Sequence, residues 1–140
     1  MVPRLIATCS TKNETFGKTR RPMPGEIPSQ SSHIVVLTTV GGEEEARELI
    51  RGLVEDRVIA CGTMVGATSI FRWEGVVSEE SETLVFLKTR RERWHDLEIA
   101  VKHRHPYDVP ELLALPVEVG LDAYLRWMNR ETSDEGARQT

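Results

Sequence analysis

The pair Glu74-Gly75 separates two long segments of β-type composition, and it constrains the fold more than any other feature of the chain. Residues 57–73 and 76–90 are rich in β-branched, aromatic and other apolar side chains, which favour strands. A short link that contains glycine is typical of the turn between two antiparallel strands. The sequence therefore predicts a long β-hairpin, with a kink near Gly62 or Gly66 in its first arm.

A strand and a helix precede the hairpin. Residues 33–40 (HIVVLTTV) are apolar and β-branched, which predicts a buried strand. Gly41-Gly42 ends this strand, and the acidic residues 43–45 favour the first turn of a helix, where the helix dipole stabilises negative charge. The apolar residues that follow recur with the 3.6-residue period of one helix face: Ala46, Leu49, Ile50, Leu53 and Val54.

A second helix and a fourth strand follow the hairpin. We expect the helix to begin near Thr89 or Arg90 and to end by His105, because Pro106 disfavours the helical conformation of the residue before it. Residues 111–120 predict a strand, which Pro116 assigns to a sheet edge because proline has no N–H to donate. A short helix, residues 121–128, and a polar terminus that frays from residue 129 complete the chain. The residues of the second helix expected to face inward are Trp94, Leu97, Ala100 and Val101.

The predicted order of elements is βαββαβ with an additional C-terminal helix. Two β-α-β units around a hairpin are typical of the α+β, ferredoxin-like sandwich, in which the helices cover one face of an antiparallel sheet. The other face is left open, and the hairpin carries more apolar side chains than a small domain needs for its own core. We therefore expect one domain over residues 33–130, which forms a homo-oligomer that buries the open face and the hairpin.

The overall charge argues against a nucleic-acid partner, and the short apolar runs argue against a membrane-spanning segment. The formal net charge is −4, whereas binding to nucleic acid requires a basic face. The longest apolar runs, such as residues 34–37 and 84–87, are far too short to span a bilayer. We therefore expect neither a nucleic-acid partner nor a membrane span.

Residues 1–32 differ in composition from the rest of the chain. They contain five Lys/Arg against two Asp/Glu, four prolines and no sustained periodicity, which predicts a flexible N-terminal extension. Arg20-Arg21 is not followed by an apolar stretch, so an export signal is not expected. A dispensable tail or an over-long start is favoured, with an organelle transit peptide as the alternative. Two cysteines, Cys9 and Cys61, form no disulfide framework and fit a reducing compartment, so we expect a cytoplasmic protein.

The candidate metal ligands are Cys61, His103 and His105. The two histidines are two positions apart, so on a helix they point in nearly opposite directions, whereas two ligands on one helix face need a spacing of four. Two histidines also fall short of the three or four ligands that zinc usually takes. His33, His95 and Cys9 add no diagnostic spacing. The sequence therefore favours opportunistic copper or zinc binding over a dedicated site within one chain, and no cofactor is expected.

A second candidate site is a small-ligand pocket at strand ends and at the corner between the second helix and the fourth strand. Polar and aromatic groups on loops of a rigid scaffold are typical of such pockets. A corner fixed only by packing of tyrosine and proline is the alternative reading. Cys61 is expected to be a buried structural cysteine, with Lys88 as a neighbouring cation if the hairpin register allows it. The pocket candidates are Trp73, Lys88, His105, Tyr107 and Glu111.

The segments SIFRWEG, FLKTRRERW, HPYDVPELLALPVEVG and YLRWM, in this order, resemble the CutA family of divalent-cation tolerance proteins. The resemblance covers about residues 33–130, and it implies a tight trimer of ferredoxin-like subunits, similar in architecture to the nitrogen-regulatory PII signalling proteins. It also implies a link to copper and other divalent-metal tolerance, without established catalysis. By motif, the pocket of the family's trimer would use Cys61, Trp73, Lys88, His105, Tyr107 and Glu111.

Two positions depart from the family pattern. Val65-Gly66 stands where the family often carries Pro-Gly, and the segment is one residue shorter, which would reverse the faces of the strand unless a bulge absorbs the change. Phe71 stands where the family usually has tyrosine, so a role that needs this hydroxyl does not carry over directly.

Three functional readings follow. The first is a non-enzymatic, trimeric protein of metal-ion tolerance, with metal contacts at subunit interfaces. The second is a small-ligand binder or an uncharacterised small-molecule enzyme that uses Lys88, His105 and Glu111 in the cleft between subunits. The third is a structural or interaction trimer that needs neither a metal nor a pocket.

Overall fold

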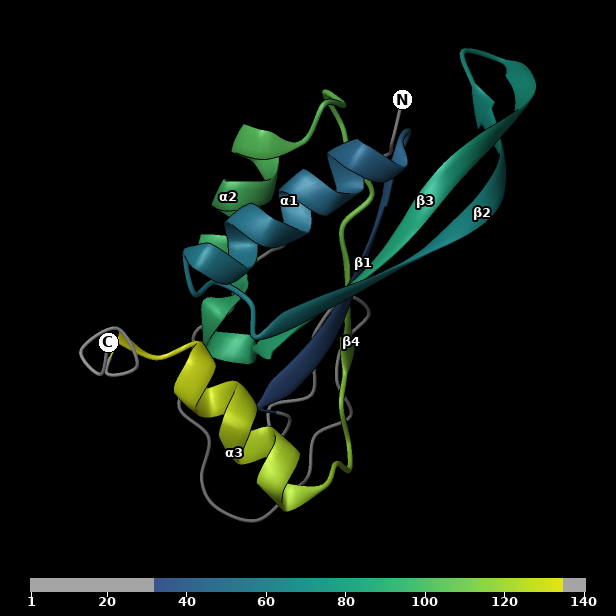
Figure 1. Ribbon diagram of the computed structural model, residues 1–140. Coiled ribbons are helices and arrows are strands. Elements are labelled where there is room, and N and C mark those ends of the chain that lie inside the picture. The colour runs from purple at the N-terminus through teal and green to yellow at the C-terminus, as the bar shows by residue number, and fades with distance from the viewer. Residues whose placement is uncertain (1–31, 135–140) are drawn as a thin grey trace, which may run out of the picture.

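The computed structural model describes residues 32–134 and has the predicted ferredoxin-like α+β architecture (Figure 1). The strands are β1 (His33–Val40), β2 (Cys61–Trp73), β3 (Val76–Arg90) and β4 (Leu113–Pro116). The helices are α1 (Glu43–Glu55), α2 (Trp94–Arg104) and α3 (Asp122–Glu131), and a 3-10 turn, Arg91–Arg93, precedes α2. The predicted extension over residues 1–32 lies almost wholly outside the described residues, as do residues 135–140, and stays a prediction.

The four strands form one antiparallel sheet in the order β2-β3-β1-β4. β4 is an edge strand, as Pro116 predicts, and β2 forms the opposite edge. The hairpin pairs β2 with β3 from Cys61↔Lys88 to Trp73↔Val76 without a break. The pairing thus contains no bulge at either of the two glycines where a kink was predicted, and the shortened segment keeps a continuous register.

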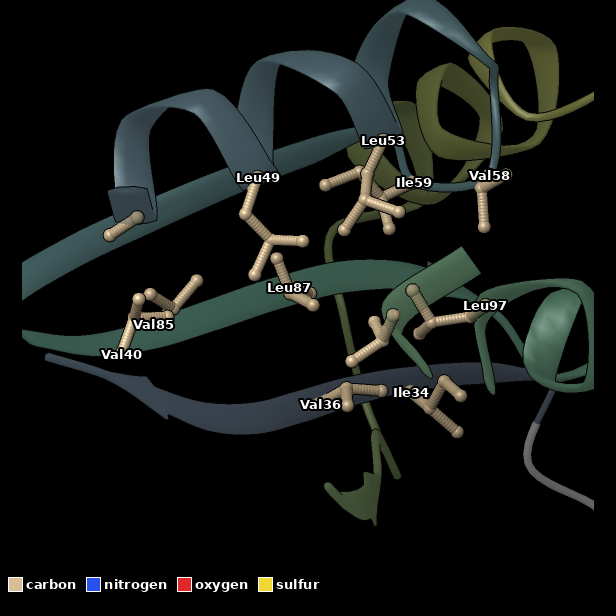
Figure 2. Packing of buried hydrophobic residues seen from close by; sticks show 12 residues of the cluster. Ile34, Val36, Val40, Leu49, Leu53, Val58, Ile59, Val85, Leu87 and Leu97 are labelled. Atoms are coloured by element: carbon tan, nitrogen blue, oxygen red, sulfur yellow. The ribbon is translucent and has the colours of Figure 1, made fainter. Parts of the chain in front are cut away.

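The core lies between the sheet and the two helices α1 and α2 (Figure 2). Alternate residues of β1 and β3 point into it, as expected for strands with one covered face, and Leu49 and Leu53 of α1 meet Leu97 and Val101 of α2 above the sheet. Val54 departs from the predicted helix face, because it lies near the end of α1 and remains exposed. Trp94 and Ala100 are only partly buried against the core.

The predicted starts of β2 and of α2 are wrong. β2 begins at Cys61 rather than at residue 57, because α1 continues to Glu55 and the chain then turns through Arg57, whose φ is 58°. Residues 58–60 are apolar because they are buried in the core, not because they form a strand. α2 begins at Trp94, after the 3-10 turn, and not near Thr89 or Arg90.

At the other end of the chain, β4 covers only residues 113–116 of the predicted 111–120, since pairing with β1 ends at Ile34↔Pro116. α3 runs to Glu131, three residues past its predicted end, and Thr132 is fully buried. Fraying therefore does not begin at residue 129. No helix within residues 32–134 combines the length and the apolar character needed to cross a membrane.

Candidate functional site

His105 is the central residue of the corner between α2 and β4. α2 ends at Arg104, and His105 has an extended backbone (φ −75°, ψ 135°), as Pro106 requires. Its Nε2–H donates to the carbonyl of Thr39 at 2.8 Å, and its Nδ1 accepts the backbone N–H of Tyr107 at 3.1 Å. Both ring nitrogens are therefore occupied in the neutral imidazole, and neither is directed at solvent.

The electrostatics of His105 agree with this arrangement. Burial, the largest cause, lowers the pKa of His105, and the hydrogen bond to Thr39 and the carboxylates of Glu82 and Glu45 oppose it. A proton on Nδ1 would also face the N–H of Tyr107, which needs an acceptor. His105 thus serves the corner as a neutral ring, and binding a metal would require one of its two hydrogen bonds to break.

Tyr107 lies against the same corner. Its hydroxyl donates to Glu82 Oε2 of β3 at 3.0 Å, and its ring is tilted against His105 at 4.9 Å between centroids. A Cβ at Gly41 would lie 3.1 Å from the Tyr107 hydroxyl, so this glycine leaves the space that the tyrosine needs. Burial, and then the bond to Glu82 with the surrounding acids, raises the pKa of Tyr107 to about 12.

Cys61 and Lys88 form a second, separate group at the base of the hairpin. The register places them directly opposite each other on β2 and β3, as anticipated for a cation beside the thiol. The Lys88 amine instead donates to Thr63 Oγ1 at 2.9 Å, and Cys61 Sγ lies 3.3 Å from the hydroxyl of Tyr124 on α3. Cys61 is half-buried rather than buried, and the hydrogen bond to it, the first cause, raises the pKa of Tyr124 to about 12.

The sequence pattern did not identify Tyr124 as a site residue. It belongs to a helix that was recognised only by its amphipathic period, and its contact with Cys61 joins residues 63 positions apart. The motif YLRWM contains it, but no feature of that motif indicates that the hydroxyl meets a thiol.

His103 and the remaining pocket candidates lie apart from both groups. His103 is exposed on α2, where it lines a cavity of about 310 Å³ together with Asp56, Asp96 and Arg104. A second cavity, of about 470 Å³, lies between α1 and β2 and contains none of the predicted residues. Within residues 32–134, no three His, Cys, Asp or Glu side chains gather in a way that could hold a metal ion.

Trp73 is at the tip of the hairpin, 47% exposed. Trp73 lies twelve positions along β2 from Cys61, so the distance along the strand is roughly 40 Å at the usual rise per residue. Glu111 is exposed beside β4. The structure therefore brings His105 and Tyr107 together, and Cys61 and Lys88 together, but a single described chain does not join these pairs to Trp73 or to one another.

The ferredoxin-like order of strands, the corner built by the HPY segment and the long hairpin are the features that the resemblance implied. The family model described as CutA1 divalent ion tolerance protein matches residues 34–131. The chain belongs to the CutA1 family. The match leaves out the N-terminal segment and the last residues of the chain, and it includes nearly all of the described fold.

Individual CutA relatives agree. The divalent-cation tolerance protein CutA of Thermus thermophilus is 46% identical over 99 residues, which cover 70% of this chain and 96% of that protein. The protein named CutA, chloroplastic, of Arabidopsis thaliana is 35% identical over 133 residues, or 94% of this chain and 71% of that protein. A solved structure described as the periplasmic divalent cation tolerance protein CutA of Archaeoglobus fulgidus superposes with a TM-score of 0.71 at 31% identity, covering 72% of this chain and 99% of that one.

Proposed function

We propose that this protein is a non-catalytic divalent-metal tolerance protein that acts as a homotrimer, with copper as the first candidate ion. One observation carries the proposal: the family model described as CutA1 divalent ion tolerance protein matches residues 34–131. The metal is inferred from this match and from relatives that are named divalent-cation tolerance proteins. Because no group of three His, Cys, Asp or Glu side chains occurs within residues 32–134, we infer a site that is assembled from more than one copy, and the proposal requires no cofactor.

The exposed apolar surface supports association. One face of the sheet is not covered by α1 and α2, and Leu113 and Leu115 of β4 remain about half exposed on it. Large contiguous apolar surfaces of this kind usually mark association. Within residues 32–134, both sheet edges also carry strand backbone without a neighbouring strand, which favours pairing with another copy. The exposed apolar residues of the hairpin are Ile70, Phe71, Trp73, Val76 and Val77.

Within this proposal, the half-buried Cys61 and the exposed His103 are the first ligand candidates, and His105 is the third. Cys61 lies at the base of the hairpin and His103 on the outer surface of α2, so they meet only between subunits. His105 would join them if its hydrogen bond to Thr39 or to Tyr107 opened. Thiolate and imidazole together suit copper and zinc.

Calorimetric titration of copper(II) into the chelator-treated, assembled protein tests the metal role. We expect saturable binding at no more than one ion per chain, weakened at least about tenfold by Cys61→Ser and by His103→Ala. His95→Ala is the matched control, because His95 is exposed on the same helix and outside the proposed set. Weak binding that none of these substitutions changes would contradict the metal role.

A small-ligand pocket in the cleft between subunits is the second candidate function, with Trp73, Lys88, His105, Tyr107 and Glu111 as its wall. The observation that favours it is the corner itself, where Gly41 makes room for a tyrosine hydroxyl beside a neutral histidine. A thermal-shift screen of small metabolites tests it, since a true ligand raises the melting temperature with its concentration. Enzymatic use of Lys88, His105 and Glu111 would require turnover of such a ligand.

We place the protein in the cytoplasm within the same proposal. The support is the interpretation of its two cysteines, which form no disulfide framework. Relatives named chloroplastic and periplasmic make other compartments the alternatives. Fractionation of the producing cells, with the N-terminal sequence of the mature protein, decides between them.

A further inference from the structure

The C-terminal end of α3 is fixed to the sheet by two arginines. Arg90, the last residue of β3, donates from Nε to Thr132 Oγ1 and from Nη2 to the Thr132 carbonyl, both at 2.7 Å. Arg93 donates from Nε to the same carbonyl at 2.7 Å. Cations at a helix C-terminus are stabilised by the helix dipole, and Thr132 itself is fully buried. Figure 1 shows this end of α3 beside the turn between β3 and α2.

Further contacts strengthen the same end. His33 of β1 donates from Nε2 to Asn129 Oδ1 at 2.8 Å, and Arg57 donates to the carbonyl of Glu131 at 3.3 Å. Met128 is 2% exposed. The last turn of α3 is thus held by β1, by β3 and by the turn after α1, so it behaves as part of the sheet.

The N-terminal half of α3 is held much less firmly. Its first residues have no side-chain cap, and Val119 and Leu121 just before it are 90% and 76% exposed. Within residues 32–134, the contact between Tyr124 and Cys61 is the one side-chain hydrogen bond from this half to the sheet. Thiols are weak hydrogen-bonding groups, so this attachment costs little to break.

The residue under this half is Cys61, the one cysteine among the described residues. Cys61 shares its end of the sheet with Lys88, whose amine is turned to Thr63. The Tyr124 hydroxyl lies 3.3 Å from the sulfur atom of Cys61 and so covers one side of the thiol. The tyrosine ring is also tilted against Trp127, at 5.4 Å between centroids, so it moves with the helix.

We infer that α3 is a hinged strap: its C-terminal end, clasped by Arg90 and Arg93, is the pivot, and its N-terminal half, attached through Tyr124, is a gate over Cys61. The use of the gate for metal entry rests on the proposed function, whereas the hinge rests on the contacts of α3 alone. Opening the gate requires the loss of the Tyr124–Cys61 contact and of the packing of the partly buried Leu125 and Trp127, while the clasp at Thr132 stays closed.

The rate of Cys61 alkylation by iodoacetamide tests the gate. The assembled protein carries Cys9→Ser, so that Cys61 is the only thiol, and the rate is measured from pH 6 to 10 so that access is separated from ionisation. Tyr124→Phe should raise the plateau rate about fivefold, the effect of losing one weak hydrogen bond. Ser133→Ala is the matched control, because the Ser133 hydroxyl donates to the carbonyl of Arg130 near the pivot instead, and it should leave the plateau unchanged.

Hydrogen exchange of α3 amides in the unmodified protein tests the pivot. We expect residues 128–132 to exchange more slowly than residues 122–126, and Arg93→Gln to remove that difference. An unchanged plateau rate in Tyr124→Phe, or equal exchange along the whole helix, would overturn the inference. Faster alkylation in Tyr124→Phe in a protein that binds no copper would support the hinge and count only against the metal role.

Discussion

At the scale of single residues, His105 shows how far sequence reasoning reaches. Pro106 correctly predicted that the helix ends and that His105 is extended. Its hydrogen bond to Thr39 could not be predicted, because it joins residues 66 positions apart and depends on the packing of α2 over β1. The sequence predicted a titratable side chain at the corner. In the fold, this side chain is a neutral imidazole whose two hydrogen bonds hold the corner in place.

The two tyrosines of the chain give a prediction from their pKa values. Tyr107 and Tyr124, both raised to about 12 in the folded protein, should ionise about two pH units above tyrosine in the unfolded chain. Because the folded pKa is higher, the stabilisation is fully present below about pH 10 and is lost as the pH rises through 12. Absorbance titration at 295 nm of the Tyr107→Phe and Tyr124→Phe variants assigns each group, and a pKa near 10 in both would contradict the hydrogen bonds to Glu82 and Cys61.

A buried hydroxyl gives a second prediction at this scale. Thr38 on β1 is fully buried, and its Oγ1 has no hydrogen-bond partner. Thr38→Val should therefore stabilise the protein by about 1 kcal/mol, since a buried polar group without a partner is costly. The matched control is Thr89→Val, which removes a 2.6 Å hydrogen bond to the Val58 carbonyl and should cost about 1–2 kcal/mol. Urea unfolding measures both, and equal destabilisation by the two substitutions would contradict the assignment.

At the scale of elements, the identity of each strand and helix was predictable, and their ends were not. Periodicity and turn residues are local signals, so they identified β1, α1, the hairpin and α2. Residues 58–60 were misread because a buried loop can be as apolar as a strand. The fourth strand was overestimated because its length depends on how many of its residues pair with β1, which its own residues do not record.

The two glycines of β2 test how α1 packs on the hairpin. A Cβ at Gly62 would lie 2.7 Å from Ile50 Cγ2, whereas nothing lies within 4 Å of one at Gly66. Gly62→Ala should therefore force α1 away from the sheet and cost about 1–3 kcal/mol. Gly66→Ala, in the same strand, should leave the free energy of unfolding within about 0.5 kcal/mol. Chemical denaturation of the two variants compares them, and equal effects would show that α1 does not approach the strand so closely.

At the scale of the whole molecule, the order of elements and the resemblance together predicted the fold and the family. The candidate site was predicted as a set of residues, and one chain joins only parts of that set. His105 meets Tyr107, and Cys61 meets Lys88 and Tyr124, while Trp73 is far along the hairpin. The sequence could not predict how the remaining site residues come together, because in the proposed function they meet only at contacts between copies of the chain. The central claim is therefore that the site exists only in the assembly.

Sedimentation equilibrium of the purified protein, with the distribution of copper(II) recorded in the same centrifuge cells, tests this claim most directly. The account predicts particles of three chains and copper that sediments with them. A single-chain mass at micromolar concentration, with copper still bound to that chain, would contradict it.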